Sequence, residues 1–427
     1  MIQKDFMSPS LNAKPKKDKA TKTKRRKKLA FPLAYFLLCV ILYIFCLPIF
    51  LASSFRSKHK DSIPQRFFAS HLSLLVEPHF WFHACSFGEV RSLEPIINAL
   101  LIQKKDCIIL ITTITHTGNA EARRLFGDKH PTRVFVKFLP FEIFLPLWQS
   151  KLDKLKSLVV MEAELWKMLF FVAKKSGAKT FLLNARISDR SYKSYQRLRG
   201  FYAGVFKYID VVLAQSVKDK KRLELFKSRN ISVFGNLKML NPPKPSKIYQ
   251  KPDRLIVLGA STHKGEEELI LHAFLQFQKI EPHSLLILAP RHPERFIEVC
   301  KTLQSRNVDF VRFSQIDEFN VKNATVVVLD TLGELVNIYA ISDIVVLGGS
   351  FVPKVGGHNP LEPAFFGTRL ISGRHIFNQQ ALFSCVSGAQ IIESNALSTT
   401  LLHYSSLPYS SVHFRKNGLE EILTLIE

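Results

Sequence analysis

This sequence of 427 residues lacks several motifs that would assign it to a well-known chemistry. It has no phosphate-binding G-x-x-x-x-G-K-[ST] loop, no H-E-x-x-H zinc helix and no D-x-D pair to hold a nucleotide-bound metal. These absences argue against P-loop hydrolysis and zinc proteolysis. They favour a metal-free site, in which cationic side chains and helix dipoles stabilise charge in place of Mg²⁺.

Cysteine is scarce and scattered. The chain has six cysteines, and no two of them have C-x-x-C spacing. This pattern argues against a zinc ribbon or a disulfide framework and fits a reducing compartment. The positions are Cys39, Cys46, Cys85, Cys107, Cys300 and Cys385.

Positive charge is abundant but unevenly spread. The net charge is +25, and residues 1–29 alone hold eleven Lys or Arg against two Asp. That segment is polar and has no hydrophobic periodicity, so we predict a disordered tail there. Charge alone also raises the alternative of a membrane-tethered nucleic-acid binder. No patch of interleaved aromatic and basic residues supports that alternative, and we expect no nucleic-acid partner.

An uninterrupted apolar segment at residues 30–53 follows the tail. It is close to the roughly 20 residues that span a bilayer, so we predict a retained membrane-anchor helix there. A cleaved signal peptide is the alternative, for which the segment is long. One full crossing with a cytoplasmic tail would export the rest of the chain, whereas a helix lying in the interface would keep both basic flanks cytoplasmic. The basic residues after the segment are Arg56, Lys58, Lys60 and Arg66.

From residue 79 onward, short apolar runs alternate with helix-length segments, which is typical of parallel sheets with crossover helices. A break rich in Pro and Lys at 241–247 divides this pattern. We predict an α/β fold with two Rossmann-like domains, 62–240 and 248–427, that face a cleft. The last amphipathic segment, 419–426, could pack on either domain. The predicted strands are residues 80–85, 107–113, 158–161, 180–183, 211–214, 255–258, 285–288, 326–329, 344–347 and 369–371.

The stretch 329–374 organises the second domain. Its strand at 344–347 ends in two glycines and a serine (348–350), where the backbone must approach something closely. A further glycine loop leads to Asn359 as a helix cap, with Glu362 in the first turn. Amide donors there suit a phosphate, and the carboxylate suits ribose hydroxyls. An ordinary strand-to-helix loop is the alternative.

Carboxylates follow two predicted strands of the first domain. Glu89 comes after a glycine turn and could act as a general base towards a hydroxyl, or could simply start the next helix. Glu162 and Glu164 follow the strand at 158–161. A carboxylate so near a buried strand end needs a partner, although Glu164 could instead pair with a helix dipole.

Basic and hydroxyl side chains supply candidate contacts to the anions of donor or acceptor. Arg186 and Arg190 are spaced i, i+4 and could clamp a phosphate or form an exposed basic face. Lys238 could place a cation in the cleft, although most lysines lie at the surface. Arg291, after a rigid Pro290, could present a fork to an anion. The other candidates are Ser86 and Arg91 beside Glu89, and Ser261 and Thr262 at a predicted helix start suited to a phosphate.

Together these residues and their order resemble the 3-deoxy-D-manno-octulosonic acid (Kdo) transferases of lipopolysaccharide assembly. The resemblance runs from about residue 81 to residue 378. Eight motifs in the family's order carry it: Ser86-Phe-Gly-Glu89, Glu162-Ala-Glu-Leu-Trp166, Asn184-Ala-Arg-Ile-Ser188, Gly235-Asn-Leu-Lys238, Ser261-Thr-His-Lys-Gly-Glu-Glu267, Pro290-Arg-His-Pro-Glu-Arg295, Asp330-Thr-Leu-Gly-Glu334 and Gly356-Gly-His-Asn-Pro-Leu-Glu362.

The resemblance implies a GT-B glycosyltransferase that uses CMP-Kdo as donor, without cofactor or metal. It implies inverting transfer of Kdo to the tetraacyl-disaccharide 1,4'-bisphosphate precursor of lipid A (lipid IVA). The enzyme would sit at the inner membrane with its catalytic domains on the cytoplasmic side. Glu89 would be the proton acceptor, and Glu162 and Lys238 would stabilise the transition state. The implied CMP-binding positions are Pro290, Arg291, Leu332, Gly333, Glu334, Asn359, Pro360, Leu361 and Glu362.

Four positions depart from the family's pattern: Ala163, Lys167, His116 and Lys264. None of them removes an implied catalytic group, and they concern the acceptor side. The alternative is a different GT-B enzyme, such as another lipid-directed sugar transferase or a nucleotide-sugar epimerase, which shares the fold but not these motifs. No motif encodes the number of Kdo units transferred.

Overall fold

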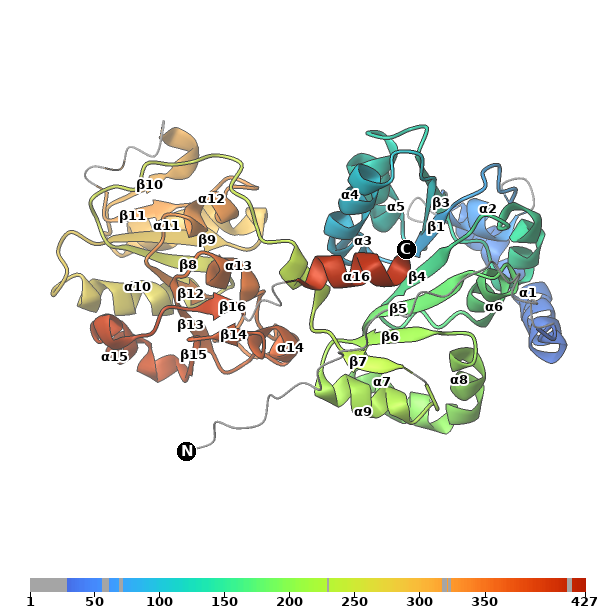
Figure 1. Ribbon diagram of the computed structural model, residues 1–427. Helices are drawn as coiled ribbons and strands as arrows, with labels where there is room; N and C mark the ends of the chain where they lie inside the picture. The colour runs from blue at the N-terminus through green and yellow to red at the C-terminus, as the bar shows by residue number, and fades with distance from the viewer. Residues whose placement is uncertain are drawn as a thin grey trace.

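The computed structural model describes residues 29–55, 61–68, 72–228, 230–316, 321, 324–412 and 417–427. The predicted tail lies outside these residues except for Leu29, and so do three of the basic residues after the anchor segment, Arg56, Lys58 and Lys60. Figure 1 shows two α/β lobes, with the apolar N-terminal helix against the first. The prediction of an α/β fold is confirmed.

The first lobe is built on a seven-stranded parallel sheet of order β3-β2-β1-β4-β5-β6-β7. The order reverses between β1 and β4, and open α/β sheets bind ligands beyond the strand ends at such a point. The strands are β1 (Phe80–His83), β2 (Ile109–Thr113), β3 (Val134–Phe138), β4 (Ser157–Met161), β5 (Lys179–Ala185), β6 (Val211–Ala214) and β7 (Ile231–Val233).

Helices cover both faces of this sheet, because its strands are apolar on both sides. Trp81 packs in one core cluster while its neighbours Phe80 and Phe82 pack in the other. The α-helices are α2 (Ser62–Phe67), α3 (Phe87–Ser92), α4 (Glu94–Gln103), α5 (His116–Ala122), α6 (Lys167–Lys175), α7 (Asp189–Arg197), α8 (Arg199–Phe206) and α9 (Val217–Glu224), with 3₁₀ helices at Glu142–Lys151 and Leu237–Leu240.

The second lobe repeats this plan with the order β10-β11-β9-β8-β12-β13-β15, so its switch point lies between β8 and β12. Its strands are β8 (Ile256–Thr262), β9 (Leu285–Pro290), β10 (Phe310–Arg312), β11 (Val326–Val328), β12 (Ile344–Leu347), β13 (Arg369–Gly373) and β15 (Gln390–Ile392), and β14 (Val386–Ser387) pairs with β16 (Ser411–Val412). Its α-helices are α10 (Glu266–Phe277), α11 (Phe296–Ser305), α12 (Leu335–Tyr339), α13 (Leu361–Phe365), α14 (Gln380–Phe383) and α15 (Leu397–Leu402).

The last helix, α16 (Gly418–Ile426), leaves the second lobe and packs on α4 of the first (Figure 1). Ile422, Leu423 and Ile426 recur at helical spacing and are buried in the first lobe's core. Lys104 and Glu427 form an ion pair of 3.0 Å at its end. The chain therefore crosses between the lobes twice.

The N-terminal helix α1 (Leu33–Ser54) is the one helix in the described part of the chain that is long and apolar enough to cross a membrane. It lies against the first lobe near α2 (Figure 1). The Tyr35 hydroxyl donates to the carboxylate of Glu142, and the Tyr43 hydroxyl donates to the carbonyl of Phe67 over 2.7 Å. One side of α1 is therefore fixed to protein, while most of its other side chains are exposed.

Candidate active site

Glu89 lies beyond the end of β1, in the first turn of α3. Its carboxylate accepts hydrogen bonds of 2.8 Å from the Cys85 amide and from the Ser86 hydroxyl. Burial raises the pKa of Glu89 to about 7, assisted by the nearby charges of Glu162 and Glu164 and opposed by the two hydrogen bonds. A carboxylate has about four acceptor sites, so two remain for a substrate hydroxyl. Glu89 therefore accepts hydrogen bonds at the start of α3 and can still act as a base near neutral pH.

Glu162 lies across the switch point from Glu89, directly after β4. Its φ of 53° is in the left-handed region, where a residue with a side chain is strained. Strained backbone of this kind clusters at functional sites. Burial raises its pKa, and the positive charges of Arg186 and Lys238 oppose that shift. A carboxylate thus sits between two cations at the end of the first sheet.

Asn184 joins this group to the segment that carries Lys238. It also has a left-handed φ of 55° and is buried. Its side-chain oxygen accepts from the Leu237 amide over 3.1 Å, and its amide nitrogen lies 3.5 Å from the Glu162 carboxylate. Lys238 itself is exposed, so its ammonium group is free to meet a ligand in the cleft.

On the second lobe, the N-cap of α13 is Pro360 rather than the predicted Asn359, which lies one residue earlier. The side-chain oxygen of Asn359 accepts from the Leu361 amide over 3.1 Å, and its amide group donates to Glu362 over 3.0 Å. Burial raises the pKa of Glu362, while Asn359, Lys238, Arg291 and then Arg91 oppose that shift. Since Lys238 and Arg91 belong to the first lobe, the tip of α13 faces that lobe.

Apolar contact joins the lobes at the same place. Met239 of the first lobe packs with Leu361 and Leu382 of the second. The segment that carries Lys238 therefore meets the start of α13, which brings Lys238 and Arg91 of the first lobe near Glu362 of the second.

Two histidines in the second lobe were not predicted as site residues. His263 follows β8 and His358 precedes α13, and their Nε2 atoms lie 2.9 Å apart with the rings stacked. Burial lowers the pKa of His358 to about 4, with His263 and Arg291 acting in the same direction. The His358 ring is therefore neutral at pH 7, so a hydrogen bond can form between its Nε2 atom and that of His263. Both histidines stand inside quoted motifs, but their pairing depends on the tertiary structure.

The chain is similar to known proteins over most of its length. Residues 61–241 match the family described as 3-deoxy-D-manno-octulosonic-acid transferase (kdotransferase). The 3-deoxy-D-manno-octulosonic acid transferase of Haemophilus influenzae is 32% identical over 362 residues, which cover 81% of this chain and 82% of that protein. The transferase of the same name from Chlamydia trachomatis serovar A is 31% identical over the same shares of both chains. This chain belongs to the Kdo transferase family.

A solved structure supports the predicted GT-B architecture of this Kdo transferase family member. The UDP-GlcNAc 2-epimerase of Neisseria meningitidis bound to UDP-GlcNAc covers 81% of this chain and 98% of its own, with a TM-score of 0.52 and 14% identity. At that identity the likeness concerns the fold alone. It confirms two facing parallel-sheet domains of the GT-B kind.

Several predicted anion contacts are occupied by the protein itself. The glycine loop after β12 does not offer its amides to a ligand, because the amides of Gly349, Ser350 and Phe351 donate to the carboxylate of Glu266. The Thr262 hydroxyl is buried and donates to Glu267 over 2.7 Å. At the start of α10, where a phosphate was predicted, two buried glutamates occupy the first turn.

Other candidates are placed differently from the prediction. Arg186 lies in the loop before α7 and Arg190 lies within α7, so the pair does not share a helix face. Arg91 is paired with Glu121 at 2.9 Å, although its charge still reaches Glu362. Ser86 caps α3 with the hydroxyl that was expected to meet an anion.

The implied CMP-binding segment before α12 is exposed at Leu332 and Gly333. The carboxylate of Glu334 is already bonded to Tyr249 at 2.7 Å and to Asn337 at 2.6 Å. A ligand would therefore meet the backbone of this segment before the Glu334 side chain. Ser261 has a left-handed φ of 54° directly before Thr262, at a bulge where β8 meets β9.

Proposed function

We propose that this chain transfers Kdo from CMP-Kdo to the tetraacyl-disaccharide 1,4'-bisphosphate precursor of lipid A, with inversion and without a metal ion or cofactor. Family membership supports the donor sugar and the class of reaction. The observation that carries the site assignment is the half-buried Glu89 at the switch point of the first lobe, where burial raises its pKa to about 7, on the same lobe as the Lys238 and Arg91 charges that reach Glu362.

In the proposed reaction, the Glu89 carboxylate accepts the proton of an acceptor hydroxyl. The hydroxyl oxygen bonds to the anomeric carbon of Kdo from the face opposite CMP. The bond between that carbon and the phosphate oxygen breaks, and CMP leaves with the electron pair, so configuration inverts. Glu162 and Lys238 flank the developing positive and negative charges, and Arg291 offsets charge on the departing phosphate.

The donor would be held by the second lobe. We propose that the tip of α13 (Asn359, Pro360, Leu361) and the Pro290–Arg291 turn meet the phosphate and that Glu362 accepts from the ribose hydroxyls. The exposed backbone at Leu332 and Gly333 would meet the base. Helix N-termini and guanidinium forks both favour anions, which supports this arrangement.

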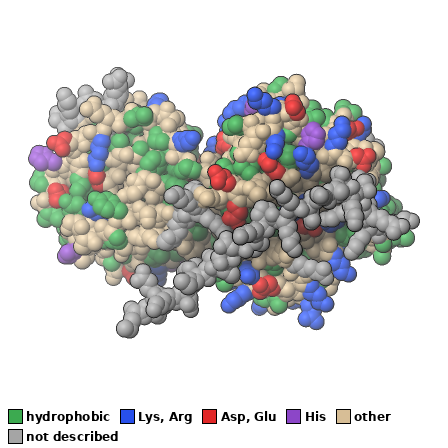
Figure 2. Space-filling model, viewed as in Figure 1, with side chains coloured by type: hydrophobic (Ala, Val, Ile, Leu, Met, Phe, Trp, Pro, Cys, Tyr) green, Lys and Arg blue, Asp and Glu red, His purple; other side chains and the backbone are tan. Residues whose placement is uncertain are grey.

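The acceptor and the membrane would meet the first lobe. Figure 2 shows Lys and Arg side chains gathered at the edge of this lobe that α7 to α9 occupy. We propose that this surface lies toward anionic headgroups and the acceptor phosphates. Its exposed basic residues are Arg190, Lys193, Arg197, Arg199, Lys207, Lys218, Lys221 and Lys227.

We also propose that α1 lies in the membrane interface, with both lobes on the cytoplasmic side. Contacts with the lobe run from Phe31, just before α1 and against Phe171, through Tyr35 of α1, bonded to Glu142, to Phe50, against Phe67. A helix held to the lobe over that length cannot cross a bilayer without taking the lobe with it. The opposite face exposes Leu37, Leu38, Ile41, Ile44 and Phe45 to lipid.

Tags at the two ends of the chain test this topology. In sealed spheroplasts treated with protease, an interfacial helix leaves both tags protected. Digestion of one tag alone would show a crossing and would contradict the proposal.

The activity test uses purified full-length protein with CMP-Kdo and the tetraacyl precursor, with and without EDTA. Mass spectrometry should detect the precursor enlarged by Kdo, at equal rates in both samples, and should count the Kdo units. UDP-sugars serve as control donors. Product from a UDP-sugar, or none from CMP-Kdo, would refute the assignment.

Glu89→Gln tests the base. The Glu89→Gln variant should lower kcat by roughly 10²–10⁴-fold while CMP binding survives, because Glu89 is not among the groups proposed to hold CMP. Glu77→Gln is the matched control, since Glu77 is on the same lobe in a surface ion pair of 3.0 Å with Lys154. Near-normal turnover by Glu89→Gln would overturn the role of Glu89.

A further inference from the structure

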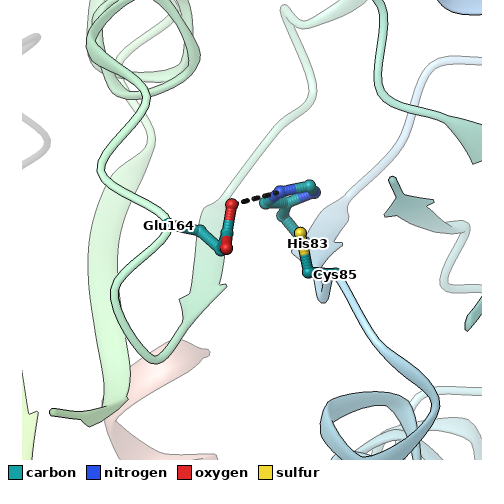
Figure 3. Close-up of side chains that lie close together, drawn as sticks. All are labelled: His83, Cys85 and Glu164. Atoms are coloured by element: carbon teal, nitrogen blue, oxygen red, sulfur yellow. Dashed lines mark ion pairs between the residues drawn. The ribbon is translucent and has the colours of Figure 1, made fainter. Parts of the chain in front are cut away.

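Three side chains of different chemistry converge at the first lobe's switch point (Figure 3). His83 ends β1, Cys85 follows it by two residues, and Glu164 lies in the loop after β4. One nitrogen, one sulfur and one oxygen atom from these residues all lie within 4.8 Å of one another. The His83 Nε2 and Glu164 Oε2 atoms are 4.0 Å apart, which is too long for a hydrogen bond.

The orientation of His83 leaves a lone pair aimed at this group. Its Nδ1 lies 3.0 Å from the carbonyl oxygen of Thr112. Nδ1 also lies 3.0 Å from the Thr112 hydroxyl, which can donate or accept, but the Thr112 carbonyl only accepts, so we assign the proton to Nδ1, which leaves Nε2 as the bare acceptor. The side chain is 0% exposed, and Nε2 has no hydrogen-bond partner within the described residues. Burial lowers the pKa of His83 to about 3, so the ring is neutral at pH 7.

The other two side chains are held near this nitrogen but remain open to solvent. The Trp166 indole N–H donates to Glu164 Oε2 over 2.7 Å and fixes the carboxylate. The Glu164 side chain is 25% exposed, and Cys85 is half-buried. An ion can therefore reach the group from the cleft.

We propose that His83, Cys85 and Glu164 form a binding site for a divalent transition metal of the zinc class, with one coordination position left open. One imidazole, one thiolate and one carboxylate is a donor set that suits Zn²⁺ or Co²⁺ and does not suit Mg²⁺ or Ca²⁺. The hydrogen bonds from His83 to Thr112 and from Trp166 to Glu164 are the outer partners that orient metal ligands.

The observed separations are close to those that a metal requires. Ligand atoms at roughly 2.0–2.3 Å from a tetrahedral zinc ion stand about 3.4–3.8 Å apart. Binding would therefore draw the three groups together by at most about 1.4 Å. The Cys85 thiol gives its proton to solvent when its sulfur bonds to the metal, so each ion bound releases one proton from the protein.

The proposed metal site adjoins the proposed transfer site, because the charge of Glu164 contributes to the raised pKa of both Glu89 and Glu162. Glu89 bonds to the backbone amide of Cys85, not to its sulfur, and Glu162 faces Arg186 and Lys238. Metal would join the end of β1 to the loop after β4 without supplying a group to the reaction. A cobalt titration measures metal binding and mass spectrometry measures Kdo transfer, so failure of one proposal is distinguishable from failure of the other.

Cobalt is the probe that tests this site, because a cobalt–thiolate bond gives a charge-transfer band in the near ultraviolet. Full-length protein in detergent, first stripped of metal with a chelator, is titrated with Co²⁺. The wild type should show the band saturating at one equivalent, and Zn²⁺ should abolish it. Cys85→Ser should lose the band, and Trp166→Phe should weaken Co²⁺ binding roughly 10–100-fold by releasing Glu164.

Cys300→Ser is the matched control, since Cys300 is also half-buried but lies on α11 of the second lobe. It should keep the wild-type band. In metal-free buffer, equal melting temperatures of the two serine variants and the wild type show that all are folded, and Zn²⁺ should raise the melting temperature of the wild type but not of Cys85→Ser. A wild-type titration that matches Cys85→Ser, or a band lost in Cys300→Ser, would overturn the proposal.

Discussion

Replacing Glu266 by Gln should destabilise the second lobe, because this carboxylate holds two loops together. Glu266 is 0% exposed. One of its oxygens accepts from the amides of His263 and Gly349 at 2.9 and 2.7 Å, and the other accepts from Ser350 and Phe351 at 3.1 and 2.9 Å. These four bonds tie the loop after β8 to the loop after β12.

The magnitude follows from counting donors. The carboxamide of Gln keeps one oxygen, which can satisfy two of the four amides, and it turns an NH₂ group toward the other two. Each buried amide left without an acceptor costs about 1–3 kcal/mol, so Glu266→Gln should lower the free energy of unfolding by about 2–6 kcal/mol. That is a large share of the roughly 5–15 kcal/mol that stabilises a domain.

Hydrogen exchange is the suitable assay, because all three tryptophans (Trp81, Trp148 and Trp166) lie in the first lobe and fluorescence would miss the second. The amides of residues 349–351 should exchange faster in Glu266→Gln, and urea should unfold the second lobe earlier by circular dichroism. Glu268→Gln is the control, since Glu268 occupies the same helical turn but is exposed and paired with Arg306 at 2.6 Å. Unchanged protection of residues 349–351 in Glu266→Gln would refute the reasoning.

Three further predictions concern the site and the joint between lobes. Burial raises the pKa of Glu89 to about 7, and a protonated carboxyl cannot accept a proton. The kcat/KM of the metal-free enzyme should therefore rise with pH through about 7 and then level, and Glu89→Gln should give a flat profile. An inflection near 4.5 would contradict this. Asn184→Ala leaves the Leu237 amide without its acceptor and should lower stability by about 1–3 kcal/mol in urea unfolding, with a lower kcat as Lys238 loses its support. Ile422→Ala should destabilise the first lobe by about 2–5 kcal/mol by tryptophan fluorescence, whereas the exposed Thr424→Ala should not; equal effects would show that α16 is not part of that core.

The central strands could be predicted from the sequence, because a strand buried on both faces must be apolar at every position. β6 and β12 begin and end at the predicted residues, and all ten predicted strands overlap an observed one. The strands that were not predicted are mostly at edges, where one side chain in two meets solvent. β7, β10 and β15 are short and hold no fully buried residue, so no long apolar run marks them. β3 is apolar apart from Lys137 and was missed although its sequence is that of a strand.

The sequence could predict site residues only where they directly follow a predicted strand. That rule placed Glu89, Glu162 and Arg291 just beyond strands that the structure also contains, because side chains after parallel strands meet at one edge of a sheet. It could not show which of them already had partners. Whether an amide faces a ligand or the protein's own Glu266 depends on how two distant loops approach each other, and no local pattern carries that information.

Close approach of backbones explains one glycine that the sequence left without a role. A β-carbon on Gly373 would lie 2.2 Å from the carbonyl oxygen of Ser350. The Gly373 amide also donates to the Ser350 hydroxyl over 2.7 Å. The end of β13 is therefore pressed against the loop that Glu266 holds, and this contact fixes that loop from its other side.

Because the amides of the loop after β12 are already bonded to Glu266, other groups must bind the negative charge of the donor. In many nucleotide-binding sheets the amides at the switch point bind the phosphate directly, but here those of residues 349–351 are bonded to Glu266. The cations left at the cleft are Arg291 from the second lobe and Lys238 and Arg91 from the first, all close enough to act on Glu362. In the proposed reaction, CMP-Kdo is therefore neutralised from both lobes at once. Because each lobe supplies only part of that charge, binding the donor should itself favour the closed cleft that brings Glu89 to the acceptor hydroxyl.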